Sequence, residues 1–186
     1  MKEVVSVAIE IREELCISDA ALRQELWEMY DETFTEVNTA TPCRQHCYKE
    51  EFLEAMQDSD FQKFLLCVDE KPVGIGLITN HLEKVPWINV AFFKKQFPVL
   101  MSVNLVYYLM GIAVKSGLAT RSLGSRLLKE MICSLPENGA VAFDYSGGAN
   151  RAIPMFAERA LPKSIKGTIL DSQIYSMYRW GDSSGQ

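Results

Sequence analysis

The sequence predicts an α+β fold in which helices flank a mixed β-sheet. Short apolar segments rich in β-branched residues recur along the chain, and amphipathic segments with helical spacing lie between them. At 186 residues, of which 48% are hydrophobic and 23% charged, the chain can bury the core of one domain. We therefore expect a single domain over residues 1–181, followed by a disordered tail over residues 182–186.

The predicted strands differ in their apolar pattern. Residues 4–11 alternate in part, whereas residues 105–114 are apolar on both faces and predict a buried central strand. Two further segments flank Asp69-Glu70-Lys71 and predict a hairpin. The predicted strands are residues 4–11, 64–68, 72–79, 105–114 and 140–145, with one or two more in residues 168–180.

The predicted helices have recognisable boundary signals. Ser18-Asp19 offers an N-cap to the first helix, and Pro136 with Asn138-Gly139 ends the clearest one. That helix presents one apolar face, made of Leu123, Leu127, Leu128, Met131, Ile132 and Leu135. The predicted helices are residues 21–34, 49–57, 87–97, 123–135 and 150–159.

Charge and hydropathy argue against several classes of partner. The net charge of −5 disfavours a nucleic-acid-binding surface. No apolar run reaches the roughly 18 to 20 residues that a membrane-spanning helix needs, so we expect no membrane partner. The N-terminus lacks the apolar core of a signal peptide, and the five cysteines are an odd number. We therefore expect reduced thiols and a cytoplasmic protein.

The segment between the central strand and the clearest helix predicts an anion-binding loop. A strand that enters a helix through a short loop exposes backbone N–H groups at the helix start, and these groups attract phosphate. Gly124 allows close approach because it has no Cβ. Ser122 is small and can cap the helix or donate its hydroxyl to phosphate. The loop therefore predicts a phosphate or pyrophosphate ligand.

This strand, loop and helix resemble motif A of the GNAT superfamily of acyl-CoA N-acyltransferases. Motif A is an apolar strand that ends near a valine, then Arg or Gln-x-x-Gly-x-Gly or Ala, and a helix with a leucine pair. Val114 and Leu127-Leu128 match the valine and the leucine pair. Ala119 then takes the Arg/Gln position and Ser122 the first glycine position, while Gly124 keeps the second. The motif is therefore degenerate at two of its three signature positions.

A second segment resembles motif B of the same superfamily, a strand followed by Asn-x-x-Ala-x-x-x-Tyr/Phe-x-x-x-Gly-Phe. This chain keeps the asparagine, as Asn150, and an aromatic residue six positions later, Phe156, but has Ala160-Leu161 in place of Gly-Phe. The order of elements before motif A is also similar. The resemblance implies a GNAT-like three-layer fold, with a central mixed, mostly antiparallel sheet flanked by helices.

The resemblance further implies acetyl-CoA or another short acyl-CoA as co-substrate, and no metal. The pyrophosphate of coenzyme A would lie on the N–H groups of residues 119–124. The pantetheine arm would pair like an added strand with Ile112 and Val114, one of whose N–H groups would stabilise the oxyanion. The residues implied in cofactor binding are Ile112, Ala113, Val114, Ala119, Thr120, Arg121, Ser122, Leu123, Gly124, Ser125, Asn150 and Phe156.

The candidate catalytic residues follow from the same resemblance. Acyl transfer to an amine needs a proton acceptor, and many members carry Glu or His six residues before the strand valine. This chain has Tyr108 there, which is a poor base when neutral and could instead line an acceptor pocket. Asp144, acting through water, is the candidate base, and it is also consistent with a plain solvated carboxylate. Phe156 lacks the hydroxyl of the usual acid, so Tyr145 is a candidate substitute or a packing residue.

Two other patterns have a simpler structural interpretation. Cys43-Arg-Gln-His46-Cys47 suggests a metal, but a zinc site needs about four ligands in paired spacings, and His81 is the only other histidine. We interpret these as ordinary loop residues. Gly74-Ile-Gly76 lies inside a strand pattern, which indicates a twist or a close backbone approach and not a phosphate loop.

Three functions are consistent with these residues. The leading hypothesis is a single-domain N-acyltransferase whose acceptor is a small amine, an amino acid, an antibiotic or a protein amine; dimerisation is common among such enzymes, so a homodimer stays open. The second is a catalytically inactive module that binds CoA or a related ligand as sensor or scaffold, which the departures from both motifs favour. The third is an acyltransferase that uses a carrier protein, for which the basic candidates are Lys94, Lys95, Lys115 and Arg121.

Overall fold

In the computed structural model, which describes residues 8–44, 46–117, 120–148 and 152–177, five strands form one sheet. The strands lie in the order β1-β2-β3-β4-β5 and are antiparallel, except that β4 and β5 are parallel. The mixed, mostly antiparallel sheet predicted from the sequence is therefore confirmed. The strand bounds are β1 (Ile9–Glu14), β2 (Phe61–Val68), β3 (Lys71–Thr79), β4 (Val106–Val114) and β5 (Ala140–Ala142).

The first strand extends further than its apolar pattern predicts. Residues 1–7 lie outside the described part of the chain, and β1 continues to Glu14. Pairing explains the extension, since β1 has a partner in β2 at every position from Ile9, opposite Val68, to Glu14, opposite Lys63. Charged side chains on an edge strand face solvent while the backbone pairs, so apolar alternation underestimates such a strand.

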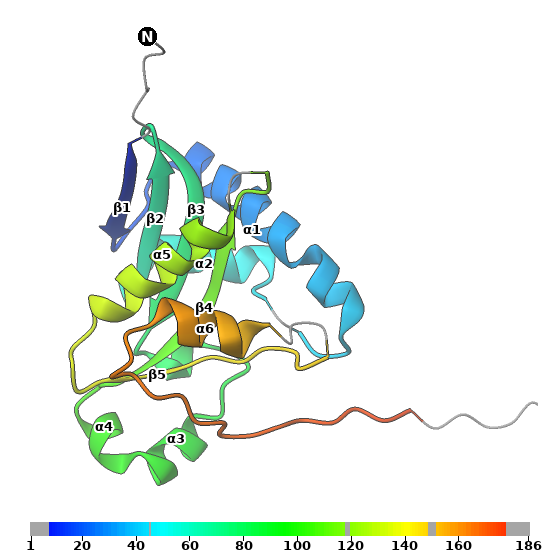
Figure 1. Cartoon of the computed structure of the whole chain (residues 1–186), viewed down its shortest axis with the longest axis vertical. Helices are drawn as coiled ribbons and strands as arrows, with labels where there is room; N and C mark the ends of the chain where they lie inside the picture. The colour runs from blue at the N-terminus through cyan, green and yellow to red at the C-terminus, as the bar shows by residue number, and fades with distance from the viewer. Residues whose placement is uncertain (1–7, 45, 118–119, 149–151, 178–186) are drawn as a thin grey trace, which may run out of the picture.

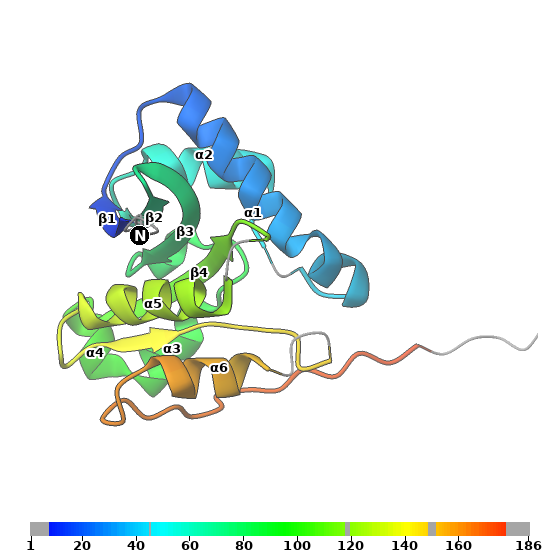
Figure 2. The ribbon, with the colours of Figure 1, turned by 45° about the horizontal axis from the view of Figure 1, so that its top comes forward.

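Helices cover both faces of this sheet. Asp19 caps the first helix as predicted, because its carboxylate accepts hydrogen bonds from the N–H groups of Ala21 at 2.8 Å and Leu22 at 3.2 Å. Figure 2 shows α1 and α2 on one side of the sheet and α5 on the other, and α6 packs against α5. The bounds are α1 (Ala20–Ala40), α2 (Lys49–Gln57), α3 (Val90–Gln96), α4 (Pro98–Ser102), α5 (Thr120–Cys133) and α6 (Ile153–Ala160), with a short 3-10 helix, η1 (Leu82–Lys84).

Each face of the sheet has its own apolar cluster. The larger cluster lies under α1 and α2 and is rich in aromatic side chains, among them Tyr30 and Phe52. The smaller cluster lies under α5, around Leu127 and Met131. Tyr107 belongs to the smaller cluster and Tyr108 to the larger one, which confirms the prediction of one tyrosine per face.

The glycines of β3 allow α5 to approach the sheet closely. A Cβ on Gly76 would lie 2.1 Å from Sδ of Met131, and one on Gly74 would lie 3.1 Å from the carbonyl oxygen of Ala113. The close backbone approach predicted for Gly74-Ile-Gly76 is therefore confirmed.

The chain after α6 differs from the prediction. Residues 161–177 form neither helix nor strand, so the strands predicted in residues 168–180 are wrong over the described part. The apolar side chains of Ile169, Ile174 and Met177 are 79%, 89% and 78% exposed. Their β-branched pattern has strand propensity, but a strand also needs an edge to pair with, and this segment pairs with no described strand. The predicted tail, residues 182–186, lies outside the described residues.

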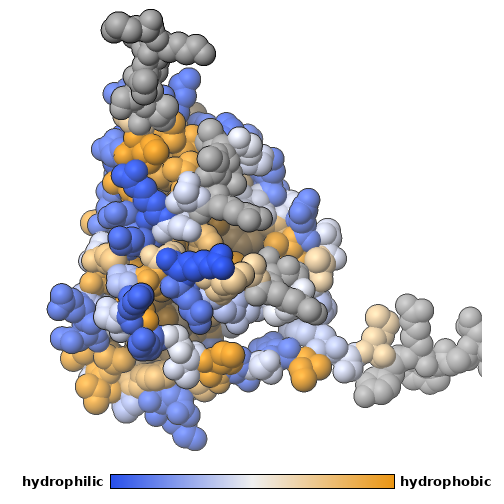
Figure 3. Space-filling view, in the orientation of Figure 1, coloured by the Kyte–Doolittle hydropathy of each residue, from blue (hydrophilic) through white to orange (hydrophobic). Residues whose placement is uncertain are grey.

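The surface around this fold mixes polar and apolar residues. Figure 3 shows apolar surface at the end of the molecule that holds α4 (Figure 1), where Val99 and Val103 are exposed. It also shows a recess with apolar walls between α1 and the side of the molecule formed by β4, α5 and α6. Among the described residues, no helix combines the length and the apolar character needed to cross a bilayer.

Candidate active site

The two parallel strands part in the middle of the sheet. β5 pairs with β4 only as far as Ala142, opposite Tyr108, and the chain then leaves the sheet, so the strand predicted over residues 140–145 ends early. β4 continues to Val114 beside β3. Over residues 109–114, the other edge of β4 faces no strand of the described chain. Backbone groups on such an edge are available to a ligand.

A β-bulge in β4 lies where the strands part. Leu77 and Ile78 of β3 are opposite Gly111 and Leu109, so Met110 has no partner in β3. The extra residue shifts the alternation of side chains between the two faces of the sheet. Val106, Tyr108, Met110 and Ala113 lie on the α1–α2 face, and Tyr107, Leu109, Ile112 and Val114 on the α5 face.

Tyr108 and Asp144, two of the predicted catalytic residues, meet beside this bulge. Tyr108 is 2% exposed, and its hydroxyl donates a hydrogen bond to Oδ1 of Asp144 and accepts one from Nε1 of Trp87 at 2.8 Å. Burial first, then the charge of Asp144 and the hydrogen bond to it, raise the pKa of Tyr108 well above its ordinary value. Tyr108 is therefore a neutral donor, and the exposed carboxylate of Asp144 is the group of the pair that can accept a proton.

Tyr145, the third predicted catalytic residue, follows Asp144 in the chain but is not part of this hydrogen-bonded pair. Its ring packs against Phe143 with 6.1 Å between centroids. No hydrogen bond within the described residues joins Tyr145 to Tyr108 or Asp144. The structure therefore brings together two of the three candidates.

Residues predicted to bind the cofactor converge at the other end of the free edge. A Cβ on Gly124 would lie 3.6 Å from Cζ of Phe156 and 3.9 Å from Cγ2 of Val114, so β4, α5 and α6 meet at this glycine. Ile112 and Val114 pack on the α5 face with Leu123, whereas Ala113 faces α1 and α2.

The loop before α5 is shorter than predicted. The helix begins at Thr120, three residues before the predicted start, so its first N–H groups belong to the predicted anion-binding segment. Ser122 is exposed and Ser125 half-buried. Ala119 and Asn150 lie outside the described residues, and of Thr120 and Arg121 only the backbone is described.

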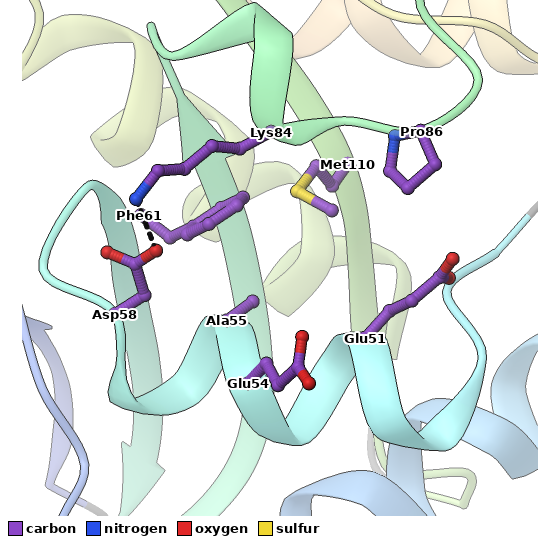
Figure 4. A pocket seen from close by; sticks show the side chains of 8 residues that line it. All are labelled: Glu51, Glu54, Ala55, Asp58, Phe61, Lys84, Pro86 and Met110. Carbon is purple, nitrogen blue, oxygen red and sulfur yellow. Dashed lines mark hydrogen bonds and ion pairs between the residues drawn. The ribbon is translucent and has the colours of Figure 1, made fainter.

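A pocket of about 250 Å³ opens beside the bulge, and Met110 forms part of its wall. Figure 4 shows Glu51 and Glu54 projecting from α2 and Asp58 directly after its last turn, with Lys84 reaching from the opposite wall to Asp58. Nζ of Lys84 lies 2.5 Å from Asp58 and 2.6 Å from Asp60, so its charge is already compensated, and its hydrogen bond lowers the pKa of Asp58. The lining residues are Glu51, Glu54, Ala55, Asp58, Phe61, Lys84, Pro86 and Met110.

An arginine that the sequence did not single out lies between this pocket and the Tyr108–Asp144 pair. Nη1 of Arg44 donates hydrogen bonds to both carboxylate oxygens of Glu51, each at 3.0 Å. Its Cζ lies 4.3 Å from the ring centroid of Tyr48 and 4.4 Å from that of Trp87. Arg44 and Trp87 are far apart in sequence, and no local pattern links them.

The Cys43–Cys47 segment has a packing role. Cys47 is buried, which raises the pKa of its thiol to about 11, and its N–H donates to the hydroxyl of Tyr30 at 3.2 Å. His46 lies within hydrogen-bond distance of Asn38, and burial lowers its pKa. Within the described residues, no group of three or more His, Cys, Asp or Glu side chains is arranged to hold a metal.

Solved structures that are similar to this chain include acetyltransferases. An aminoglycoside acetyltransferase from an uncultured soil metagenomic sample, in complex with sisomicin, is 14% identical, with 91% of this chain and 97% of that chain covered and a TM-score of 0.56. An aminoglycoside N-acetyltransferase in complex with CoA is also 14% identical, with 94% and 97% covered and a TM-score of 0.56. A protein from Clostridium difficile 630, described as a possible acetyltransferase, is 11% identical, with 92% and 99% covered and a TM-score of 0.51.

These similarities extend over nearly the whole of both chains, so the GNAT-like fold predicted from the sequence is confirmed. No protein-family model matches the chain, and no curated protein matches its sequence. At 11–14% identity, the likeness shows the shared fold alone.

Proposed function

We propose that this chain is an N-acyltransferase that moves an acetyl or other short acyl group from acyl-CoA to an amine. The observation that carries the proposal is the free edge of β4 over residues 109–114. One end of this edge lies beside Tyr108 and Asp144, and the other beside Gly124 and Phe156. An extended ligand could therefore hydrogen-bond along the edge with its reactive end at a proton acceptor.

The cofactor half of the proposal uses backbone groups. The first turn of α5 offers N–H groups to a pyrophosphate, and Gly124 lets it approach. The free edge of β4 offers the pairing that a pantetheine arm needs. One of the structures with this fold is in complex with CoA, which supports acyl-CoA as the co-substrate.

The chemical step needs few side chains. The amine nitrogen attacks the thioester carbonyl, a C–N bond forms, the C–S bond breaks, and CoA departs as a thiolate, which needs no acid because thiols ionise near pH 8.5. A backbone N–H on the free edge of β4 stabilises the oxyanion. Asp144 accepts the proton of the amine through water, and Tyr108 holds the carboxylate in place.

The acceptor half of the proposal is the pocket beside Met110. Its carboxylates Glu51, Glu54 and Asp58, together with the neighbouring Asp60, outnumber the two cations that pair with them, Lys84 and Arg44, by four to two. Such a pocket favours a small molecule with more than one ammonium group. The metagenomic acetyltransferase with this fold is in complex with sisomicin, which supports a small-molecule amine acceptor.

We also propose that the protein works in the cytoplasm.

Calorimetry with acetyl-CoA and CoA tests the cofactor half. We expect wild-type Kd values of about 1 to 100 μM, within the usual range for enzyme substrates. In Gly124→Ala, an added Cβ would be in ordinary contact with Phe156 and Val114, and under the proposal it would hinder the close approach of the pyrophosphate to the backbone. We expect binding about tenfold weaker while helix propensity raises stability by up to about 1 kcal/mol. Gly167→Ala, with no neighbour within 4 Å of its Cβ, is the matched control and should change neither. A folded wild type that binds neither compound would contradict the proposal.

A second function is a module that binds CoA without transferring an acyl group. Tyr108, a neutral residue at the position where the resemblance to motif A leads one to expect a base, favours it. Release of free thiol from acetyl-CoA in the presence of a diamine or an aminoglycoside separates the two functions. Tight binding without thiol release by any amine would favour the module.

A further inference from the structure

Arg44 lies in the segment between α1 and α2, where its guanidinium is enclosed on three sides. The rings of Tyr48 and Trp87 face it with Cζ-to-centroid distances of 4.3 and 4.4 Å, and the carboxylate of Glu51 accepts two of its hydrogen bonds at 3.0 Å. Its side chain is 22% exposed. Cation–π contacts and charge-assisted hydrogen bonds therefore fix the position of this guanidinium group.

Glu51 anchors the arginine to α2. Oε2 of Glu51 also accepts a hydrogen bond from the N–H of Tyr48 at 2.8 Å, which caps the first turn of that helix. The carboxylate is thus fixed by the helix that carries it, and it fixes Arg44 in turn. Since Glu51 also lines the pocket beside Met110, the same contact shapes the pocket wall.

Trp87 transmits this arrangement to the catalytic pair. Its indole Nε1 donates to the hydroxyl oxygen of Tyr108 at 2.8 Å, and the two rings meet edge to face at 6.3 Å. Because that oxygen accepts from Trp87, the hydroxyl hydrogen points away from the indole and toward Oδ1 of Asp144. The direction of one hydrogen bond thereby sets the direction of the next.

We propose that Arg44 is a positioning residue: it clamps the indole of Trp87 so that Tyr108 donates to Asp144, and it couples this alignment to the wall of the acceptor pocket through Glu51. Its kinetic consequence rests on the proposed function, whereas the alignment itself does not. The chain of contacts runs from Glu51 through Arg44, Trp87 and Tyr108 to Asp144.

Lysine cannot replace arginine in this position. A guanidinium is flat, so it can stack on two rings and still present N–H groups in its own plane to a carboxylate. An ammonium group is a compact charge without a stacking face, and it would keep the ion pair with Glu51 but release the ring of Trp87. Arg44→Lys therefore separates the charge of residue 44 from its clamping action.

The indole N–H of Trp87 reports the alignment directly. In an ¹⁵N spectrum the three tryptophans give separate indole signals, and Trp87→Phe assigns the one of interest. We expect the Trp87 N–H to exchange with solvent at least tenfold faster in Arg44→Lys and Arg44→Ala than in wild type. Arg23→Lys is the matched control, because Arg23 donates to the carbonyl oxygens of Ile17 and Ser18 instead. Unchanged exchange in both Arg44 variants, with the fold intact by circular dichroism, would overturn the proposal.

Steady-state kinetics give the second readout. With a diamine as acceptor, we expect Arg44→Lys and Trp87→Phe each to lower kcat about tenfold while KM for acetyl-CoA stays within twofold of wild type. Equal kcat in wild type and Arg44→Lys would also overturn the proposal. If no amine is acetylated by wild type, the proposed function fails, and the exchange rates alone then decide the positioning role.

Discussion

The two faces of the sheet are held in different ways. On the α1–α2 face, the larger apolar cluster is reinforced by polar contacts at its rim, namely the half-buried Arg44–Glu51 pair and the more exposed contacts of Lys84 with Asp58 and Asp60. On the α5 face, the cluster is smaller, no described side chain of α6 is fully buried, and the segment after α6 is exposed. The face that lines the proposed acceptor pocket thus carries more internal contacts than the face that would hold the proposed cofactor.

This difference indicates where a ligand would add stability. A molecule that pairs with the free edge of β4 supplies contacts that the α5 face lacks, and binding to the folded state stabilises it by mass action. The α1–α2 face already has its contacts and should respond little.

Lys63 provides the strongest test of how polar contacts stabilise the α1–α2 face. It is a fully buried lysine of β2, and its Nζ donates to the carbonyl oxygens of Leu15, Asp58 and Phe61. Lys63→Met fills the same volume but leaves these carbonyls without that donor, so we expect a loss of about 3 kcal/mol in unfolding free energy, measured with urea. Lys71→Met, on the exposed end of the same hairpin, should change it by less than about 0.5 kcal/mol. A loss below about 1 kcal/mol for Lys63→Met would show that the polar contacts do not distinguish this face.

A substitution of Asp144 tests the proposed proton acceptor beside the free edge of β4. Asp144→Asn keeps an oxygen for the hydroxyl of Tyr108 but cannot accept the proton of the amine. We expect kcat to fall about a hundredfold with acetyl-CoA binding unchanged by calorimetry, in line with the usual contribution of a general base. The control is Asp171→Asn, an exposed residue outside any helix or strand. Full activity in Asp144→Asn would place the proton acceptor elsewhere.

Gly76 tests how α5 is attached to the sheet. The Cβ of Gly76→Ala would lie 2.1 Å from Sδ and 2.7 Å from Cε of Met131, which is itself fully buried. Met131 must change rotamer, so we expect a loss of about 2 kcal/mol in unfolding free energy. Hydrogen exchange should then increase in α5 and not in α1. Gly148→Ala, whose Cβ would meet nothing closer than 3.8 Å, is the control; equal stability of the two variants would contradict the tight packing of α5.

Local patterns predicted the elements whose signals lie within a few residues. The cap at Asp19, the turn at Asp69-Glu70, the buried central strand and the helix with the Leu127-Leu128 pair all follow from such signals. Both turn residues have positive φ, 47° and 67°, which suits a two-residue hairpin. The fold class was therefore within reach of the sequence alone.

Long-range partners account for what the sequence did not predict. Strand propensity in residues 168–180 could not reveal that no described edge pairs with this segment, and the early end of β5 depends on where the chain leaves β4. The α2 helix and the β2–β3 hairpin separate Arg44 from Trp87 in the sequence, so only the tertiary fold brings these two side chains together. Tyr108 was within reach because the resemblance to motif A placed it on the central strand, six residues before Val114, and Asp144 because it lies at the end of the next predicted strand. The hydrogen bond that joins these two residues was not predicted.

The smallest expected effect is the pH dependence of stability, which separates the contribution of the charge of Lys63 from that of its burial. Burial, opposed by the charges of Cys16, Asp58 and Asp60, lowers the pKa of Lys63 to about 8, below the value near 10.4 of an unfolded lysine. Between these two values the unfolded chain binds more protons than the folded one, so this group makes stability rise with pH. We expect the stability of wild type relative to Lys63→Met to increase by about 1 kcal/mol between pH 7 and pH 9 in urea unfolding at matched ionic strength. If the difference in unfolding free energy between wild type and Lys63→Met is the same at both pH values, the three carbonyl oxygens keep the ammonium group of Lys63 charged. The stability of the α1–α2 face would then depend on this charge more than on burial.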